Sequence, residues 1–462
     1  MARTRVLALV AALALSGCGG GDDPSAETET PRWRVKDGFV RAPDGRRAIL
    51  RGANLAGSHK FSPYFGFHQP ADYAALREHW GMTSIRFLIL WAALEPEKGS
   101  YDEAYLDGIE ERMGWARDAG LTVVLDMHQD VYGEGFTGGD GAARWTCDEA
   151  NYKAFTPTSP WFLNYLDPAV QACVDGFYGS DELQDHYIEA WRRVAGRLGK
   201  HDAVVGFDVM NEPHWGSGAM TGYEELELQP FYERLVPRVR EVAPSWLAFL
   251  EPGASRNLGT PTGLTPMPFL DVVYAPHSYN ASAEQGQGFD PKVRGALISN
   301  IETLATEARA LDAALWVGEY GGTSTSPGIT EYMDASYDGF ASVAASSMYW
   351  AYDANSGGYG MLNDDRTPKP VMEEILIRPA PELVAGDPVS WTFDEKTRNF
   401  ALTWHPDPAV MAPTVLSVPA RVYPNGYSVS CDGCESEQAT GRLTISVPPK
   451  GDPALVELVA KP

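Results

Sequence analysis

Positive charge is scarce in this chain. Among its 462 residues, 37 lysines and arginines stand against 62 aspartates and glutamates, which gives a formal net charge of -25. A nucleic-acid-binding protein needs a basic surface to displace counterions from phosphates, and electrostatic docking on anionic lipid needs the same positive field. The composition therefore argues against a nucleic-acid partner and against electrostatic attachment to an anionic membrane.

Long apolar runs are also missing beyond the N-terminus. There, Arg3 and Arg5 precede an apolar run of about ten residues, which has the length of a signal-peptide core and is too short to span a bilayer. The run ends in the letters LSGC at Cys18, which resemble a bacterial lipobox. This resemblance implies lipid attachment at Cys18 after cleavage. The alternative is an ordinary secretory signal with an incidental cysteine.

The N-terminal pattern predicts export. We expect residues 1–18 to be a lipoprotein signal peptide that ends at Cys18, and residues 19–33, which are rich in glycine and acidic side chains, to be a flexible linker. The protein is then a lipoprotein of the bacterial cell envelope, held at the membrane through its N-terminal lipid, or a secreted protein. No other segment of the sequence is long and apolar enough to be transmembrane.

Cysteine is scarce as well, with five in the whole chain. Once Cys18 is set aside, an even number remains, which in an exported protein predicts two disulfides. Of the three possible connectivities, the local one is the simplest, with Cys147 bonded to Cys173 and Cys431 bonded to Cys434. The second pair forms a CDGC run that is also compatible with a redox or zinc site. No second CxxC or histidine pair lies near it, so a structural bridge is favoured.

Short apolar runs alternate with amphipathic runs between residues 37 and 353. The apolar runs lie at residues 46–55, 83–90, 121–128, 204–213, 246–253, 271–279, 314–322 and 347–353. Between them, apolar residues recur three or four positions apart, as on one face of a helix. Eight strands that alternate with helices predict an α/β fold, a (β/α)8 or TIM barrel. An open doubly wound sheet is the competitor, but it lacks a glycine-rich phosphate-binding turn after the first strand.

The pattern changes after residue 353. From about residue 380 onward, short alternating runs are separated by turn residues, which predicts a small β-sandwich of about 80 residues. We therefore place a catalytic barrel at residues 34–378 and a C-terminal β-sandwich at residues 379–462.

One connection inside the predicted barrel is unusually long. Residues 131–180 follow the third predicted strand and include both cysteines of the first predicted bridge together with many aromatic residues. Loops of this length in compact domains are usually lids or binding loops. The aromatic content suggests a wall that contacts sugar or lipid, and the alternative is that the rings pack into a small core of their own.

Polar side chains gather where the predicted strands end. Catalytic residues of this fold lie at the carboxyl ends of the strands. The candidates at these ends are Arg86, Asp126, His128, Asp130, Asn211, Glu212, Glu251, His277, Tyr279, Glu319, Trp350 and Asp353. Because burying so many ionisable groups is costly, their convergence on one face predicts a functional site. We expect Asp126 and Glu251 to support the site and not to be catalytic.

Two of the acids, Glu212 and Glu319, follow the fourth and seventh predicted strands on opposite sides of the barrel. Opposed carboxylates across a cleft are what glycoside hydrolysis requires. Asn211 offers an amide for the sugar 2-hydroxyl, and Arg86 either keeps Glu319 ionised or forms a structural ion pair. A metal site built from His128, Asp130 and Glu212 has no supporting HxH or HExxH spacing. We therefore expect no metal and no cofactor.

The ordered set of motifs resembles glycoside hydrolase family 5. The motifs are Asn211-Glu212-Pro213 after an apolar strand, Glu319 in VGEYGG, Arg86 in IRF, His128 in DMHQD, His277-Ser278-Tyr279, and Trp350 in YWAYD. The resemblance covers the whole predicted barrel. It implies that Glu212 is the acid/base, that Glu319 is the nucleophile, and that the configuration of the sugar is retained.

A finer resemblance is to the endoglycoceramidases and related glycolipid-degrading members of that family. It is carried by LDMHQDVYG, the long insertion ending in FYG, WAYDANSGGYGML, and a sandwich that opens with VAGDPVSWTFD. It implies a set of sugar-binding residues, namely Lys60, His128, Asp130, Asn211, Tyr279 and Trp350. Arg86 and His277 then support the glutamates. Lys60 lies in a loop, and a solvated surface lysine is its alternative interpretation.

The resulting hypothesis is a retaining endo-β-glycosidase that cuts between an oligosaccharide and a lipid aglycone, ceramide. We expect it to act as a monomer on a glycolipid or oligosaccharide substrate, with the pKa of Glu212 raised by the neighbouring Glu319. One alternative is another family 5 activity, of the cellulase, mannanase or steryl glycoside hydrolase type. The other is a non-catalytic glycan-binding lipoprotein, which is disfavoured because both glutamates are present.

Overall fold

The computed structural model describes residues 31–354, 356–448 and 453–461. The predicted signal peptide, Cys18 and residues 19–30 of the predicted linker lie outside the described residues. Within the described ranges, no helix combines the length and the apolar character that crossing a membrane demands.

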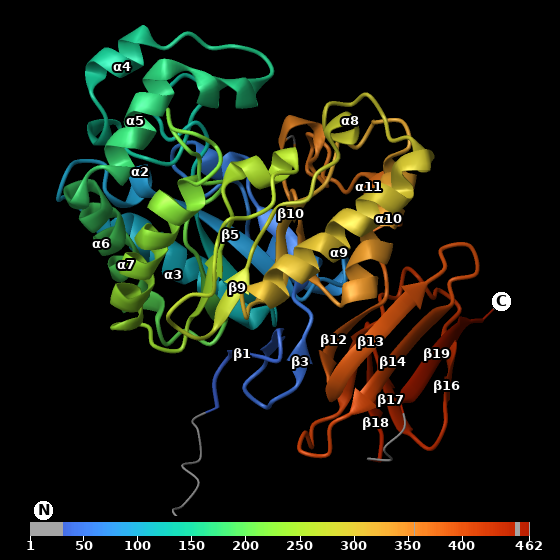
Figure 1. Cartoon of the computed structure of the whole chain (residues 1–462). Helices are drawn as coiled ribbons and strands as arrows, with labels where there is room; N and C mark the ends of the chain where they lie inside the picture. The colour runs from blue at the N-terminus through green and yellow to red at the C-terminus, as the bar shows by residue number, and fades with distance from the viewer. Residues whose placement is uncertain (1–30, 355, 449–452, 462) are drawn as a thin grey trace, which may run out of the picture. The chain divides into compact units, whose positions relative to one another are not determined.

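Eight parallel strands close into a barrel, which confirms the predicted (β/α)8 fold (Figure 1). The strands are β4 (Arg51–Leu55), β5 (Ser84–Leu90), β6 (Thr122–His128), β7 (Val204–Asp208), β8 (Leu247–Leu250), β9 (Val272–Tyr274), β10 (Ala314–Tyr320) and β11 (Ser346–Tyr349). Each overlaps one of the predicted apolar runs, and β11 pairs with β4 to close the barrel. The carboxyl ends of the strands thus meet at one end, which we call the mouth.

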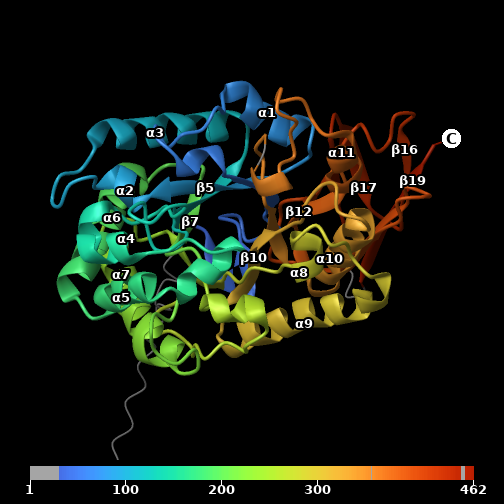
Figure 2. The same cartoon turned by 90° about the horizontal axis from the view of Figure 1, so that it is seen from above.

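Amphipathic helices surround the strands (Figure 2). They include α1 (Pro70–Glu78), α3 (Glu103–Asp118), α6 (Asp181–Leu198), α7 (Gln229–Arg240), α9 (Arg294–Ala310), α10 (Ile329–Val343) and α11 (Pro370–Leu376). At the start of α6, the Ser180 hydroxyl accepts a hydrogen bond from the Leu183 amide, which caps the helix. Trp191, Val194 and Leu198 then recur at helical spacing and bury one face against the barrel.

The side chains inside the barrel change from apolar to charged toward the mouth. On β6, Val124, Asp126 and His128 are two residues apart and therefore share the inward face. Val124 packs with Phe249 and Trp316 in a buried apolar cluster. The same strand therefore contributes first to the core and then, at its end, to a polar site.

Residues 34–48 differ from the expected domain boundary. β1 (Arg34–Lys36) and β2 (Phe39–Arg41) form an antiparallel hairpin, and β3 (Arg47–Ala48) pairs with β12 (Ala380–Val384) of the C-terminal domain. The hairpin turns at Asp37 and Gly38, whose φ angles of 54° and 76° suit a two-residue turn. Because the closed barrel offers no edge strand for pairing, this segment extends the sheet of the other domain.

The C-terminal domain contains two antiparallel sheets, as the alternating pattern predicts. One has the order β1-β2-β3-β12-β15-β18-β17 and the other β13-β14-β19-β16. The further strands are β13 (Gly386–Phe393), β14 (Phe400–Pro406), β15 (Thr414–Ser417), β16 (Tyr427–Cys431), β17 (Glu435–Ala439), β18 (Arg442–Ser446) and β19 (Ala454–Ala460). On β14, Phe400, Leu402 and Trp404 are buried, which is the expected period of two.

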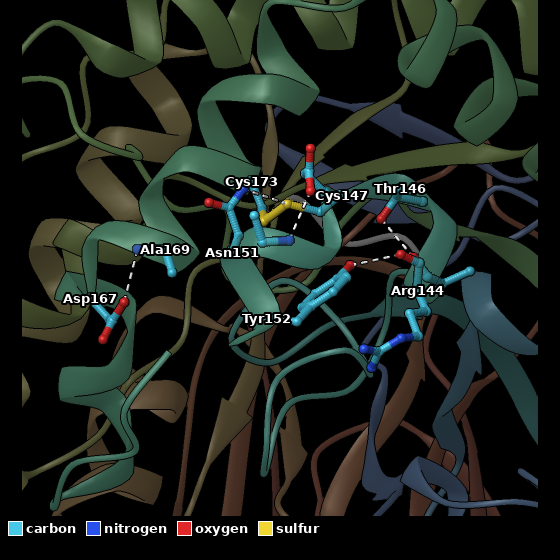
Figure 3. The surroundings of a disulfide bond; sticks show 11 residues. Arg144, Thr146, Cys147, Asn151, Tyr152, Asp167, Ala169 and Cys173 are labelled. Atoms are coloured by element: carbon cyan, nitrogen blue, oxygen red, sulfur yellow. Dashed lines mark hydrogen bonds between the residues drawn. A yellow bond between two sulfur atoms is a disulfide. The ribbon is translucent and has the colours of Figure 1, made fainter. Parts of the chain in front are cut away.

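The long insertion is helical and is braced by a disulfide. It contains α4 (Glu149–Ala154), the short helix η3 (Trp161–Leu166) and α5 (Pro168–Tyr178). Figure 3 shows the bond between Cys147 and Cys173, which ties the start of α4 to α5. Cys431 is bonded to Cys434, so both predicted pairings are formed.

Candidate active site

The mouth of the barrel brings together the residues that the strand ends predict. His128 ends β6, Glu319 lies near the end of β10, and Trp350 directly follows β11. Glu212 lies four residues beyond the end of β7, in a left-handed backbone conformation with a φ of 41°. Its amide donates to Glu251 Oε2 at 2.9 Å. Glu251 therefore supports the backbone of Glu212, as predicted from the sequence.

Glu212 and Glu319 lie close together with His277 between them. The His277 Nδ1 atom is 2.8 Å from Glu212 Oε1 and 3.5 Å from Glu319 Oε2. One oxygen of each carboxylate and a ring nitrogen of His277 all lie within 4.8 Å of one another. Retaining glycosidases have carboxyl groups about 5 Å apart, whereas inverting enzymes need about 6.5–9.5 Å to admit a water. The geometry is therefore that of a retaining pair.

Arg86 is the buried cation of the site. It donates to Glu319 Oε1 at 2.7 Å and to Glu251 Oε1 and Asp208 Oδ2 at 2.9 Å each. Burial would lower the pKa of Arg86, but the carboxylates around it, those of Asp126 and Asp208 first, raise it well above its usual value. Arg86 therefore combines the two roles considered from the sequence, since it contacts Glu319 and also neutralises structural acids.

The two glutamates have different partners. The Tyr279 hydroxyl donates to Glu319 Oε2 at 2.8 Å, so both oxygens of Glu319 are occupied, one by Tyr279 and the other by Arg86. Such donors stabilise a carboxylate. Burial nevertheless raises the pKa of Glu319, and His277 and Arg86 offset this only in part.

The expected rise in the pKa of Glu212 is wrong. Burial would raise that pKa, but the hydrogen bond and the positive charge of His277 lower it below its usual value. Burial would also lower the pKa of His277, yet Glu251 and Glu319 raise it well above its usual value. The carboxylate of Glu319 would raise the pKa of Glu212, but the fold also places the cationic imidazole of His277 against Glu212.

His128 is oriented by an acid on its own strand. Its Nδ1 atom lies 2.8 Å from Asp126 Oδ2, and its ring stacks on Trp350 with centroids 5.4 Å apart. Burial and the Lys60 charge would lower the pKa of His128, but Asp126 raises it to about 9. The contact with Asp126 directs Nδ1 of His128 toward the strand. Nε2 therefore points toward the mouth and lies 3.6 Å from Asp130 Oδ2.

Lys60 belongs to the site and is not a solvated surface residue. Its ammonium forms an ion pair with Asp130, lies 3.6 Å from Asp140 Oδ2, and sits 4.9 Å from the centroid of a Trp350 ring. His128, Asp130 and Asp140 offer atoms close enough to hold a cation, but Lys60 already places a positive charge there. Asp140 was not predicted, because it lies in a glycine-rich part of the insertion without periodic pattern.

Gln129 is a second residue that the sequence did not identify. Its Nε2 atom donates to the backbone carbonyls of Asn211 at 2.7 Å and Glu212 at 3.0 Å. Its Oε1 atom accepts from the Tyr165 hydroxyl at 3.3 Å and from the Tyr132 amide at 2.8 Å. Gln129 thereby links the braced insertion to the loop that carries Glu212.

A small apolar pocket, with a cavity volume of about 30 Å³, lies beside these residues. Its lining comes from the insertion, α2 (Trp91–Leu94), α6 and the loop after β7. The apolar and aromatic residues in it are Trp91, Val174, Phe177, Tyr178, Tyr187 and Met210. His128, Gln129 and His214 form its side toward the mouth. His214 stacks on Tyr165 with ring centroids 4.6 Å apart, and burial lowers its pKa to about 3, so it is neutral. The aromatic residues of the insertion thus form a packed wall next to the site.

Comparisons with known proteins agree with this geometry. The family model described as cellulase (glycosyl hydrolase family 5) matches residues 44–356, and that of the glycoside hydrolase family 5 C-terminal domain matches residues 378–453. Endoglycoceramidase I of Rhodococcus hoagii is 26% identical over 90% of this chain and 86% of its own length.

Solved structures of endo-glycoceramidase II from a Rhodococcus species are similar over most of the chain. The complex with ganglioside GM3 is 32% identical, with a TM-score of 0.83 over 92% of this chain and 99% of that one. The lactosyl-enzyme intermediate is also 32% identical, with a TM-score of 0.82 over 94% and 100% of the two chains. From the family models, the strand-end residues and the barrel together, the chain belongs to glycosyl hydrolase family 5.

Proposed function

We propose that the protein is a retaining endo-β-glycosidase that hydrolyses the bond between the oligosaccharide and the ceramide of glycosphingolipids. The observation that carries the reaction type is the pair Glu212 and Glu319, whose oxygens lie within 4.8 Å with His277 between them. The substrate class is supported by the names of the similar proteins, which are endoglycoceramidases, one of them solved with ganglioside GM3.

In this mechanism Glu319 attacks the anomeric carbon while the bond from that carbon to the ceramide oxygen breaks. Glu212 gives its proton to the departing oxygen, and a covalent glycosyl-enzyme forms. Glu212 then takes a proton from water, whose oxygen attacks the same carbon and displaces Glu319. Arg86 and Tyr279, each on one oxygen of Glu319, hold the nucleophile in place.

The sugar ring would be bound by the remaining polar groups of the mouth. Trp350 supplies a flat apolar face, and Lys60 and Asp130 can donate to and accept from adjacent hydroxyls. The Asn211 Nδ2 group donates one hydrogen to the Gln129 carbonyl at 3.1 Å. Its second hydrogen can be donated to the sugar 2-hydroxyl. These contacts explain why the candidate residues converge in one place.

The apolar pocket supports a lipid aglycone. Its wall comes from the insertion after β6, and its polar side is formed by His128, Gln129 and His214 next to the glutamates. The part of a ceramide nearest the glycosidic bond can contact this small apolar surface.

Two substitutions test the assigned roles. Glu319→Gln should abolish turnover of every substrate, because no other carboxylate replaces the nucleophile. Glu212→Gln should lose about 10²–10⁴-fold in kcat/KM on glycolipids but retain kcat/KM on aryl glycosides with good leaving groups, because formation of their glycosyl-enzyme needs no acid. The kcat/KM values on both substrates are the measurement. Equal loss on both substrates in Glu212→Gln would contradict its role as the acid.

A panel of substrates tests the specificity. Mass spectrometry should detect intact oligosaccharide and free ceramide from lactosylceramide and gangliosides, and no product from soluble cellulose or mannan. Release of soluble oligosaccharides from cellulose, with glycolipids left intact, would favour the cellulase-like alternative. Products from neither class over long incubation would favour the non-catalytic one.

We also propose, from the N-terminal sequence, that the enzyme is exported and carries a lipid on Cys18. The basic start, the short apolar run and the LSGC sequence support this localisation.

A further inference from the structure

The loop after β8 reaches the side chain of Glu212. This loop contains the short helix η5 (Ala254–Leu258), and the Nδ2 group of Asn257 donates to Glu212 Oε1 at 2.7 Å. His277 Nδ1 approaches the same oxygen at 2.8 Å. Among the described residues, none forms a hydrogen bond with the other oxygen, Oε2. The two oxygens of Glu212 therefore have very different surroundings.

Asn257 is exposed, but the loop that presents it is anchored. The buried carboxylate of Glu224 accepts hydrogen bonds from the amides of Gly253 at 2.7 Å, Gly263 at 2.5 Å and Leu264 at 3.1 Å. The Glu224 side chain thus binds the backbone at both ends of the loop. Hydrogen bonds from backbone amides to a carboxylate are charge-assisted and are among the stronger ones in proteins.

The helix within the loop is anchored as well. Buried Arg256 forms an ion pair with Glu307 at 2.9 Å, and the Ala254 amide donates to the Pro213 carbonyl at 2.8 Å. Pro213 is the neighbour of Glu212, so the loop is tied to the same stretch of backbone as the acid. Although the side chain of Asn257 is exposed, the backbone that presents it is held in place by these buried contacts.

We propose that Asn257 is a positioning residue for the acid/base: together with His277 it occupies Oε1 of Glu212, so that the proton to be transferred is carried on Oε2. A proton on Oε1 would point at two N–H donors, which is repulsive, whereas Oε2 is free to carry it. The two donors also stop the carboxylate from turning. This inference rests on the proposed function, in which Glu212 protonates the leaving oxygen.

Other titratable groups face Glu212 from every side of the mouth and set the baseline for any titration. They are His128 at the end of β6, Asp130 after β6, Glu251 after β8, His277 after β9, Glu319 on β10, and Glu284 on α8 (Ala281–Glu284). Burial raises the pKa values of the nearby Tyr165 and Tyr279, so their hydroxyls stay neutral. Asn257 does not titrate, so Asn257→Ala removes one hydrogen bond against a constant background.

The test compares Asn257→Ala, Asn257→Asp and wild type. Losing a donor to a carboxylate raises its pKa, and a second negative charge raises it more. The alkaline limb of the kcat/KM profile on a glycolipid should therefore move up by about half a pH unit in Asn257→Ala and about one unit in Asn257→Asp. At its own optimum, kcat/KM on glycolipid should fall about tenfold while kcat/KM on an activated aryl glycoside is retained. Leu258→Ala, an exposed neighbour on the same helix, is the matched control and should match wild type.

A direct titration separates this inference from the proposed function. The carbon-13 carboxyl signal of Glu212, assigned by its loss in Glu212→Gln, should titrate higher in both Asn257 variants. If it does so while wild type cleaves no glycolipid, the positioning role stands and the proposed function fails. If wild type cleaves glycolipids but neither the signal nor the alkaline limb moves in the variants, the proposed function stands and Asn257 has no positioning role.

Discussion

Glu212 and Glu319 are chemically identical side chains that differ in what touches their oxygens. Glu319 has a guanidinium on one oxygen and a phenol on the other, and these donors hold the carboxylate in place although burial leaves its pKa raised. Glu212 has its donors on one oxygen. The two acids therefore differ in how their oxygens are held, by neighbours that come from different strands and loops.

The buried imidazole of His128 predicts a pH dependence of stability. Its pKa rises from the usual 6.5 to about 9 on folding, so its contribution is fully present below pH 6.5 and is lost as the pH rises through about 9. We expect the free energy of unfolding to fall by up to about 3 kcal/mol over this window. In His128→Asn the slope should be smaller, as measured by urea unfolding at several pH values.

His405 is the matched control for that measurement. It is exposed on β14, far from the site in sequence, and His405→Asn should leave the slope of the wild type unchanged. An identical slope in wild type and His128→Asn would show that another group is responsible.

The sequence identified most of the site because those residues end strands. His128, Glu319 and Trp350 sit where a period-two pattern stops, and the parallel barrel brings such ends together. Gln129, Asp140 and Asn257 escaped prediction for the opposite reason. Gln129 acts through backbone carbonyls, and the other two lie in loops, where no periodicity shows which way a side chain points.

At the scale of elements, the insertion between β6 and α6 acts on the site through one side chain. Tyr165 of η3 donates to Gln129, which in turn holds the carbonyl of Glu212. The disulfide between Cys147 and Cys173 fixes α4 against α5 on either side of η3 (Figure 3). The insertion is therefore both a wall of the apolar pocket and a support for the acid.

Replacing both Cys147 and Cys173 by serine should weaken this support. The bridge closes a loop with a sequence separation of 26, and its loss should cost up to about 3 kcal/mol of stability. Because Gln129 then loses a fixed partner, kcat/KM on glycolipids should fall more than kcat/KM on an activated aryl glycoside. Thermal unfolding and the two rates are the measurements.

The second bridge provides the control. Cys431 and Cys434 lie in the C-terminal domain with a sequence separation of 3, and their replacement by serine should leave both rates unchanged. An equal loss of both rates in the Cys147 and Cys173 variant would indicate general unfolding and would contradict a specific link to Glu212.

At the scale of the whole chain, the barrel and the C-terminal domain are connected by shared strands and by hydrogen bonds. β1, β2 and β3 precede the barrel in sequence but extend a sheet of the C-terminal domain, and Arg77 of α1 donates to Glu382 of β12 at 3.0 Å. The Ser417 hydroxyl donates to the Gly81 carbonyl at 2.9 Å, close to the start of β5. These contacts lie toward the amino ends of the strands, which suits a packing role for the C-terminal domain.

Localisation is also a property of the whole chain. The lipobox resemblance predicts that the full-length protein takes up labelled palmitate in a bacterial host and sediments with membranes. Cys18→Ala should abolish the label and release the enzyme into the soluble fraction with its specific activity intact, because residue 18 lies far in sequence from the barrel. A labelled Cys18→Ala protein would contradict attachment at this residue.

The sequence by itself determined the barrel, the small β domain, both disulfide partners and the two opposed glutamates. Each of these depends on periodicity, turn residues or position at a strand end, which are local properties of the chain. The tertiary structure decided that residues 34–48 join the other domain, that His277 lowers the pKa of Glu212, and that Asn257 and Gln129 hold the acid. Pairing partners and electrostatic neighbours come from segments distant in sequence, so no local pattern contains them.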